Sequence, residues 1–287
     1  MSYRWIFTTL AYLVAFVAAW QPPSYSGYSL VWQQNFRGSW GELPSTSTWN
    51  IIVRDKNYNN ELQRYTKDKS NLRLSGKSTL QLIPQYTTSA PNNWTSARIE
   101  SKYTFTPTAG KITRLEASLR LAGNPQLRKQ GIWPAFWLLG DSNRRGVTWP
   151  ECGEIDIMEN INGEKIGYAS LHCDKYPNGI CNEPVGIAAQ TSLLDSKYHV
   201  WRVSIDRRNS NYKSQSITWY LDGKIFHKVT GTKIGNTTVW KALAQSPVFV
   251  ILNVAVGGDW PGAPNKNTWG NTGSMMEVGY VAHYVTK

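Results

Sequence analysis

The chain has 287 residues, of which 31 are Lys or Arg and 19 are Asp or Glu, so its net charge at pH 7 is +12. This length admits one large all-β domain or two small ones and suffices for a substantial core; we expect one domain. The charge permits binding to polyanions, but the basic residues are mostly scattered singly and no basic helix is indicated. We therefore expect no nucleic-acid partner and attribute the excess to solubility and attraction to acidic wall material.

The first nineteen residues, MSYRWIFTTLAYLVAFVAA, carry an Arg near the start, then an apolar stretch, then small residues up to Ala19. That order is typical of a secretory signal peptide. The apolar run is short and early for a membrane span, although an uncleaved signal anchor stays open. We expect cleavage after Ala19, a secreted and extracellular protein, and no membrane contact after cleavage. The mature chain, 20–287, would carry a charge of +11, because Arg4 is the one charged residue removed.

Strand signals run through most of the mature chain, with apolar or aromatic residues that alternate with polar ones or stand together. The segments are 72–74, 80–83, 112–121, 198–205, 217–226 and 248–256. Gly, Asn and Pro turns separate them, a pattern typical of an all-β sandwich or barrel. Within 217–226, Asp222-Gly223 is the clearest hairpin signal. Helical periodicity is weak, and residues 238–245 are the one candidate for a short helix.

An aromatic segment, GIWPAFW, spans residues 131–137. A period of two places Trp133 and Trp137 on one strand face with the small Ala135 between them. Indole faces suit the C–H faces of sugar rings, and the indole N–H can reach a hydroxyl. The alternative is that these indoles belong to the core. We favour a sugar platform because an acidic strand follows.

That acidic strand is GEIDIMEN, residues 153–160. Glu154 and Asp156 alternate with isoleucines, which predicts a half-buried strand with both carboxylates on one face. Glu159 breaks the period, and a β-bulge near Met158 would return it to that face. The carboxyls of Glu154 and Glu159 would then stand about 5–6 Å apart, as a retaining glycosidase requires. A merely solvated acidic face is the alternative, but crowded like charges destabilise a strand unless something uses them.

Three cysteines are present, Cys152, Cys173 and Cys181. In a secreted protein this number predicts one disulfide and one free thiol. The spacing of Cys173 and Cys181 around a Pro-Asn-Gly turn suits a bonded loop, which leaves Cys152 as the buried thiol. The spacing fits no zinc pattern. Asn93 and Asn236 are glycosylation acceptors, usable only if the host secretes through a eukaryotic pathway.

Seven segments together resemble glycoside hydrolase family 16, in the branch of the laminarinases (endo-β-1,3-glucanases) and their secreted fungal relatives. They are YNNELQRYT, TSARIESK, GIWPAFWLLG, GEIDIMEN, ASLHC, WYLDGK and ILNVAVGGDWPG, and the resemblance covers about residues 29–284. It implies a β-jelly-roll sandwich of the concanavalin A-like lectin/glucanase type, with a substrate cleft across its concave face. It further implies a monomer acting on a polysaccharide without a required cofactor. Whether a structural calcium ion is bound by backbone carbonyls and an Asp stays open, and no metal ligands are assigned.

Residue roles follow from the same resemblance. Glu154 would be the nucleophile, Asp156 its partner and Glu159 the general acid/base. The charge of Glu154 would raise the pKa of Glu159 towards the value that an acid needs. Asn253 lies in an apolar strand, where an unpaired amide would be costly, so we expect a ligand or a network partner for it. The expected substrate-binding residues are Trp133, Trp137, His172, Asn60, Glu61, Arg98, Asn253 and Trp260.

Three functions are compatible with these residues. The first is an endo-β-1,3-glucanase that cuts laminarin-like or mixed-linkage glucan from cell walls or stores. The second keeps the mechanism but acts on a β-1,3-galactan or another galactan. The third is a non-catalytic glucan-binding lectin, because this fold also hosts binding modules. The presence of all three acids argues against the lectin, and the sequence does not decide between the two hydrolases.

Overall fold

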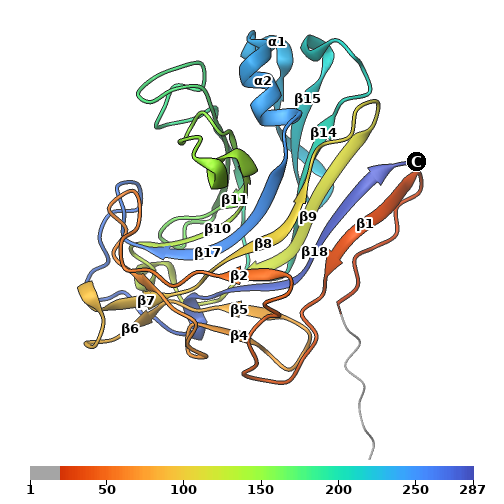
Figure 1. The fold of residues 1–287 in the computed structure, drawn as a ribbon. Coiled ribbons are helices and arrows are strands. Elements are labelled where there is room, and N and C mark those ends of the chain that lie inside the picture. The colour runs from red at the N-terminus through yellow and green to blue at the C-terminus, as the bar shows by residue number, and fades with distance from the viewer. Residues whose placement is uncertain (1–19) are drawn as a thin grey trace, which may run out of the picture.

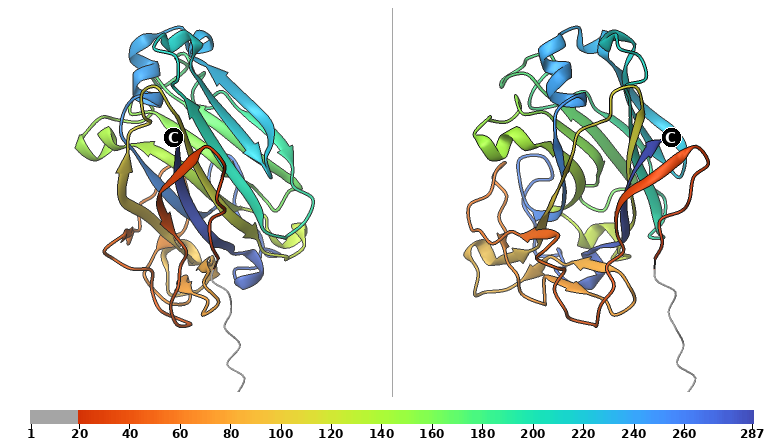
Figure 2. Two further views of the ribbon diagram at one scale, coloured as in Figure 1. Left: turned by 90° about the vertical axis from the view of Figure 1, so that its right-hand side faces the viewer. Right: turned by 45° about the vertical axis from the view of Figure 1, so that its right-hand side comes forward.

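The computed structural model describes residues 20–287, so the expected signal peptide lies outside the described part of the chain. Two large antiparallel sheets pack face to face (Figures 1 and 2). In spatial order, the seven-stranded sheet contains β13 (Ala189–Ser192), β12 (Ile166–His172), β11 (Glu154–Glu159), β10 (Ile132–Gly140), β17 (Val248–Val256), β8 (Arg98–Phe105) and β2 (Trp49–Ile51). Its middle strands β10, β17 and β8 bend strongly in Figure 1.

The second sheet has eight strands. Their order is β16 (Lys224–Thr230), β15 (Ser216–Leu221), β14 (His199–Asp206), β9 (Ile112–Leu121), β18 (Met276–Thr286), β5 (Leu80–Leu82) and β4 (Leu72–Leu74), with β1 (Tyr28–Gln34) paired to β18. A small third sheet contains β3 (Arg64–Tyr65), β7 (Trp94–Ser96) and β6 (Gln85–Tyr86). The predicted all-β jelly-roll sandwich is confirmed.

Helices are short and few in the described residues. The α-helices are α1 (Gly231–Ile234) and α2 (Thr237–Ala244), which lie together at one end of the sandwich (Figure 1). The 3-10 turns are η1 (Pro91–Asn93), η2 (Gln126–Arg128), η3 (Asp141–Arg145), η4 (Tyr212–Ser214) and η5 (Thr272–Ser274). No helix within residues 20–287 is long and apolar enough to cross a bilayer.

Several elements end where the sequence predicts. Strands β4, β9 and β17 match the predicted segments 72–74, 112–121 and 248–256. The segment 217–226 is a hairpin, because Asp222 (φ 49°) and Gly223 (φ 81°) adopt the left-handed conformation of a tight turn between β15 and β16. The predicted helix is α2, where the Asn236 side chain accepts hydrogen bonds from the N–H groups of Thr238 and Val239.

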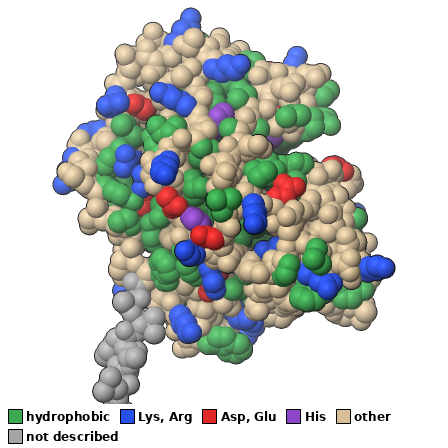
Figure 3. Space-filling view, turned by 180° about the vertical axis from the view of Figure 1, so that it is seen from behind, with side chains coloured by type: hydrophobic (Ala, Val, Ile, Leu, Met, Phe, Trp, Pro, Cys, Tyr) green, Lys and Arg blue, Asp and Glu red, His purple; other side chains and the backbone are tan. Residues whose placement is uncertain are grey.

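The tryptophans divide between core and surface. Trp49, Trp201, Trp219 and Trp240 are less than 2% exposed, so the high tryptophan content serves the core in part. Trp219 and Trp201 lie in the eight-stranded sheet and belong to the large apolar cluster between the sheets. Basic side chains are dispersed over the face seen in Figure 3, and no single patch concentrates them on that face.

Close packing at the end of β10 yields a stability prediction. A Cβ atom on Gly140 would lie 1.8 Å from the carbonyl oxygen of Cys152, a backbone atom that cannot rotate away. We expect Gly140→Ala to lower the free energy of unfolding by about 3 kcal/mol, measured by chemical denaturation. Gly123→Ala is the control, because its nearest neighbour would be the Ser196 hydroxyl at 3.5 Å, and its effect should stay within about 0.5 kcal/mol. Equal stabilities would contradict the backbone contact.

Candidate active site

A β-bulge lies in the middle of β11, as predicted. Against β10, Met158 pairs with Phe136 and Asp156 with Trp137, so Ile157 has no partner there. Against β12, the register also shifts between Asp156 and Glu159. Ile157 and Met158 are both fully buried in the core. Because two consecutive residues point inward, Glu159 returns to the face of Asp156.

The core holds this bulge in place. Trp219, on β15 of the opposite sheet, donates its indole N–H to the backbone carbonyl of Asp156 at 2.8 Å. The bond crosses the sandwich and satisfies a carbonyl beside the irregular pairing, where a buried unpaired group would be costly. The bulge is therefore tied to the packing of both sheets.

Three carboxylates share the outer face of β11, which we call the carboxylate face. Asp156 and Glu159 are 4% and 7% exposed, and Glu154 is partly exposed. Trp133 donates its indole N–H to Oε1 of Glu159 at 2.9 Å. Oδ2 of Asp156 is buried and accepts no hydrogen bond from the described residues.

His172, at the end of β12, faces these acids. Its Nε2 lies 3.3 Å from Oδ2 of Asp156, an ion-pair distance at which the N–H is not aligned for a hydrogen bond. Its Nδ1 lies 2.7 Å from Oε2 of Glu183. The structure thus places His172, a predicted binding residue, beside the acids. With a carboxylate beside each ring nitrogen, both nitrogens are expected to carry protons.

The electrostatics of the carboxylate face follow from burial and crowding. Burial, followed by the charge of Asp156, raises the pKa of Glu154 to about 8 and that of Glu159 well above its ordinary value. The nearby His172 opposes both shifts. Burial alone would lower the pKa of His172, but its contacts with Asp156 and Glu183 outweigh this and hold it well above the ordinary value. The cluster therefore retains protons on some of its acids near neutral pH, as a general acid requires.

Glu154, Asp156 and His172 also meet the spacing of a metal site, because one potential ligand atom from each lies within 4.8 Å of the others. A protonated imidazole nitrogen has no lone pair to give a metal ion. With both ring nitrogens of His172 facing carboxylates, the chemistry of this donor set suits proton transfer better than metal binding.

The two predicted platform tryptophans both bond to polar residues of the site. Trp133 reaches Glu159, as described, and Trp137 donates to Oδ1 of Asn253 at 2.7 Å. The Asn253 amide in turn donates to the Tyr65 hydroxyl at 3.2 Å. Asn253 therefore has the network partners that its apolar strand demands, and Trp133, Trp137 and Asn253 lie together.

The other predicted binding residues surround this group. Arg98 stacks its guanidinium 4.9 Å from the centre of the Trp137 ring, and Glu61 accepts from Gln63 and Tyr65. Trp260 is 43% exposed and packs edge-on against Trp133 at 5.6 Å. Asn60 is exposed and bonds to Asp259, beside Trp260, at 2.7 Å. No contact within the described residues joins Asn60 directly to the three acids.

Several residues that complete the site were not predicted from the sequence. Gln63 and Tyr65 follow Glu61 at every second position of YNNELQRYT, and Tyr168 precedes His172 by four positions in β12. A period of two would therefore have placed each of them on the same strand face as a predicted residue. Tyr168 packs against Trp260 at 5.0 Å. Glu183 had no such signal, because only the fold brings its loop to His172.

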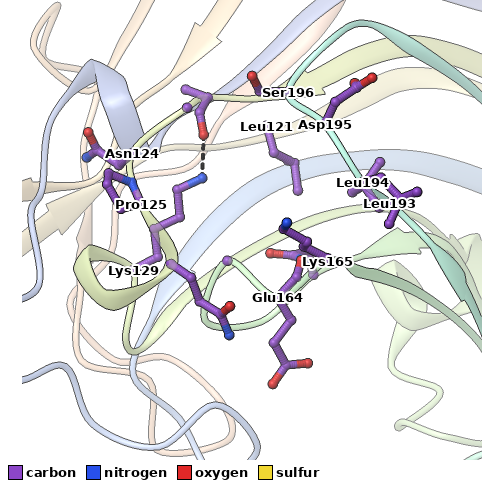
Figure 4. A pocket seen from close by; sticks show the side chains of 15 residues that line it. Leu121, Asn124, Pro125, Lys129, Glu164, Lys165, Leu193, Leu194, Asp195 and Ser196 are labelled. Carbon is purple, nitrogen blue, oxygen red and sulfur yellow. Dashed lines mark hydrogen bonds between the residues drawn. The ribbon is translucent and has the colours of Figure 1, made fainter.

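A separate pocket of about 260 Å³ is lined in part by the loop that joins β11 to β12 (Figure 4). Lys129, Glu164 and Ser196 are among its lining residues, and Lys129 donates to the Ala122 carbonyl. Burial lowers the pKa of Lys129 to about 8. Glu164 also accepts a hydrogen bond from Tyr168 at 2.6 Å. The pocket holds none of the three β11 carboxylates, so we assign the chemistry to the carboxylate face.

The bond from Trp133 to Glu159 predicts a shift in pH dependence. Trp133→Phe removes a donor that stabilises the ionised carboxylate, so the pKa of Glu159 should rise further. Since a general acid acts when protonated, the basic limb of the kcat/KM profile should move to higher pH, with a loss of about 1–2 kcal/mol of transition-state stabilisation. Trp137→Phe, the control, loses a bond to Asn253 instead and should leave that limb in place. An unmoved limb in Trp133→Phe would argue against Glu159 as the acid.

Comparisons with known proteins agree with this geometry. Residues 56–200 match the family model described as "XgeA-like, catalytic GH16 domain". A solved endo-1,3-beta-glucanase from Streptomyces sioyaensis is 32% identical, with a TM-score of 0.86, over 93% of this chain and 99% of that one. A beta-glucanase from Rhodothermus marinus is 26% identical over 82% of this chain and 78% of its own length.

A glucan endo-1,3-beta-glucosidase A1 from Niallia circulans is 29% identical over 91% of this chain. The match spans 38% of that larger protein. The residues matched by the family model, 56–200, include β10, β11 and β12, the strands around the carboxylate face.

Proposed function

The chain belongs to glycoside hydrolase family 16, and on that premise we propose that it is an endo-acting retaining hydrolase of β-1,3-glucan or mixed β-1,3/1,4-glucan. The observation that carries the proposal is the bulge in β11, which gathers Glu154, Asp156 and Glu159 on one face. The activities of the three named relatives supply the glucan class.

In the proposed reaction, Glu159 donates a proton to the glycosidic oxygen while the carboxylate of Glu154 attacks the anomeric carbon. A covalent glycosyl-enzyme forms and the leaving chain departs. Glu159, now ionised, takes a proton from a water molecule that releases the sugar with retained configuration. Asp156, whose Oδ2 accepts no hydrogen bond from the described residues, shares a proton with Glu154. Because side chains supply both nucleophile and proton, the reaction needs no cofactor.

Substrate contacts are proposed for the aromatic and polar residues around the acids. Trp133, Trp137 and Trp260 would stack on sugar rings, and Trp260 is the most exposed of the three in the described structure. Arg98, Asn60 and Glu61 would meet hydroxyl groups. Asn253 and His172 are buried and hold other groups in place, so their contribution is orientation of the site.

A reducing-sugar assay against a panel of polymers tests the proposal. The panel contains β-1,3-glucan, mixed-linkage β-glucan, xyloglucan, β-1,3-galactan and agarose. We expect release from the first two. Release from a galactan alone would establish the alternative hydrolase, and binding to glucan without release would establish a lectin.

Secretion, cleavage after Ala19 and a monomeric state belong to the same proposal. Their support is the leader-like composition of residues 1–19 and the state of the cysteines. Cys173 and Cys181 are bonded to each other, and the free Cys152 is buried and so unable to link two chains without rearrangement. The three named relatives are bacterial, so they give the fungal branch no support. Mass spectrometry of the culture medium would test the cleavage site.

A further inference from the structure

Glu183 is a buried carboxylate that the proposed reaction does not yet use. Its side chain is fully buried. Oε2 lies 2.7 Å from Nδ1 of His172, and Oε1 accepts the backbone N–H of Cys173 at 2.8 Å. A buried carboxylate is costly unless it is paired and hydrogen-bonded. His172 is the basic side chain that pairs with it.

The loop around Glu183 fixes its position. The Cys173–Cys181 disulfide closes the loop that begins next to His172. Backbone hydrogen bonds join Asn178 to Glu183 in both directions, at 2.9 and 2.6 Å. The His172 ring has little freedom, because a Cβ atom on Gly186 would lie 2.8 Å from its Cε1 and the Trp149 ring packs 5.6 Å away.

The charged side chains that contribute most to the pKa of His172 are all acidic. Glu154 and Asp156 approach from β11, and Glu183 from the loop; the remaining packed groups named above, Trp149 and Gly186, carry no charge. A cation at His172 therefore lies between the catalytic carboxylates and a fourth carboxylate outside the reaction. This arrangement resembles the general case in which a buried acid fixes the orientation and protonation of a histidine.

From this geometry, and resting on the proposed function, we infer that Glu183 is a positioning residue that keeps His172 doubly protonated, with Nε2 directed at Asp156. The cation lowers the cost of negative charge on Asp156 and Glu154. Glu183 touches neither the substrate nor a reacting atom, and acts through His172. The disulfide loop thereby becomes part of the catalytic machinery.

Glu183→Gln removes the negative charge beside Nδ1 of His172. Without the carboxylate, the pKa of His172 falls and the ring loses its charge at lower pH. The positive charge that opposes the raised pKa of Glu154 and Glu159 is then lost, so both values rise. Both limbs of the kcat/KM profile should move to higher pH, and kcat should fall about a hundredfold with little change in KM.

The experiment compares the wild-type protein with Glu183→Gln, Glu183→Asp and Glu277→Gln. Glu183→Asp keeps the negative charge. Both limbs of its kcat/KM profile should therefore stay at the wild-type pH, although the rate is reduced. Glu277 is the matched control, because it is also buried and paired, with Arg120, but lies on β18 of the other sheet. Glu277→Gln should lower the melting temperature without moving either limb.

A second readout does not depend on activity. Imidazole NMR should show His172 protonated in the wild type well above pH 7, and titrating at lower pH in Glu183→Gln. A neutral His172 at pH 7 in the wild type would overturn the inference, as would unmoved limbs in a folded Glu183→Gln enzyme. If the wild type hydrolyses no polymer of the panel while the NMR result is as expected, the proposed function fails and the pairing of Glu183 with His172 stands.

Discussion

Glu154→Gln is expected to reduce hydrolysis of β-1,3-glucan at least about a thousandfold while leaving polysaccharide binding intact. An amide has nearly the shape of a carboxylate but cannot form the glycosyl-enzyme. Glu154 is partly exposed at the edge of the cluster and stays close to Asp156 and His172, so the swap removes a nucleophile and disturbs little packing. Initial rates of reducing-sugar release measure the loss of hydrolysis, and polysaccharide gel retardation measures the affinity for the polymer.

The control for this variant is Glu151→Gln. Glu151 is exposed in the loop three residues before Glu154, and the same change there should leave rate and binding within twofold. Substantial hydrolysis by Glu154→Gln would remove Glu154 from the role of nucleophile. Loss of binding together with activity would instead indicate that the variant disturbs the substrate-binding surface.

Local patterns were sufficient to predict much of the fold. Alternation in 112–121 and the apolar run of 248–256 predicted strands with the observed ends, because each segment is long and bounded by turns. The Asp222-Gly223 turn followed from the conformations that those two residues tolerate. The disulfide between Cys173 and Cys181 and the buried free Cys152 followed from cysteine number and spacing, and both are confirmed.

The parts that could not be predicted depend on contacts between distant segments. Trp219 bonds to Asp156 across 63 positions of sequence, and no local period encodes such a bond. Glu183 is hidden for the same reason. The tryptophan count also misled in part, because an indole has the same sequence signature in a core as on a sugar platform. Only the register of the sheets separates Trp219 from Trp133.

The last prediction concerns the bulge and the stereochemistry together. Deleting Met158 leaves Glu154, Asp156 and Glu159 at alternate positions of a regular strand, which would present all three on one face without a bulge. The deletion also removes a fully buried side chain, at a cost of about 2–5 kcal/mol in stability. We expect a less stable enzyme with detectable activity, whereas Glu159→Gln in the parent should lose most of its activity.

Deleting Ile155 is the matched control, since it also removes one buried apolar residue from β11. It leaves the bulge but makes Glu154 and Asp156 adjacent, so Glu154 turns towards the core and cannot act as nucleophile. If activity depends on the face that carries the carboxylates and not on the length of the strand, it should survive the deletion of Met158 but not the deletion of Ile155. The reverse order of activities would show that the bulge itself is required.

The stereochemistry of the product tests the same arrangement of carboxylates independently of the activity of the variants. With Glu154 and Glu159 on one face at the expected carboxyl separation of about 5–6 Å, no room remains for a water molecule between nucleophile and sugar, so hydrolysis should pass through the covalent intermediate. Proton NMR of the earliest products should show the β-anomer before mutarotation supplies the α-anomer. The Met158 deletion should give the same anomer, because it keeps both carboxyls on that face. An α-anomer appearing first in the parent enzyme would mean that water attacks directly, and the retaining mechanism would then be wrong whatever the variants showed.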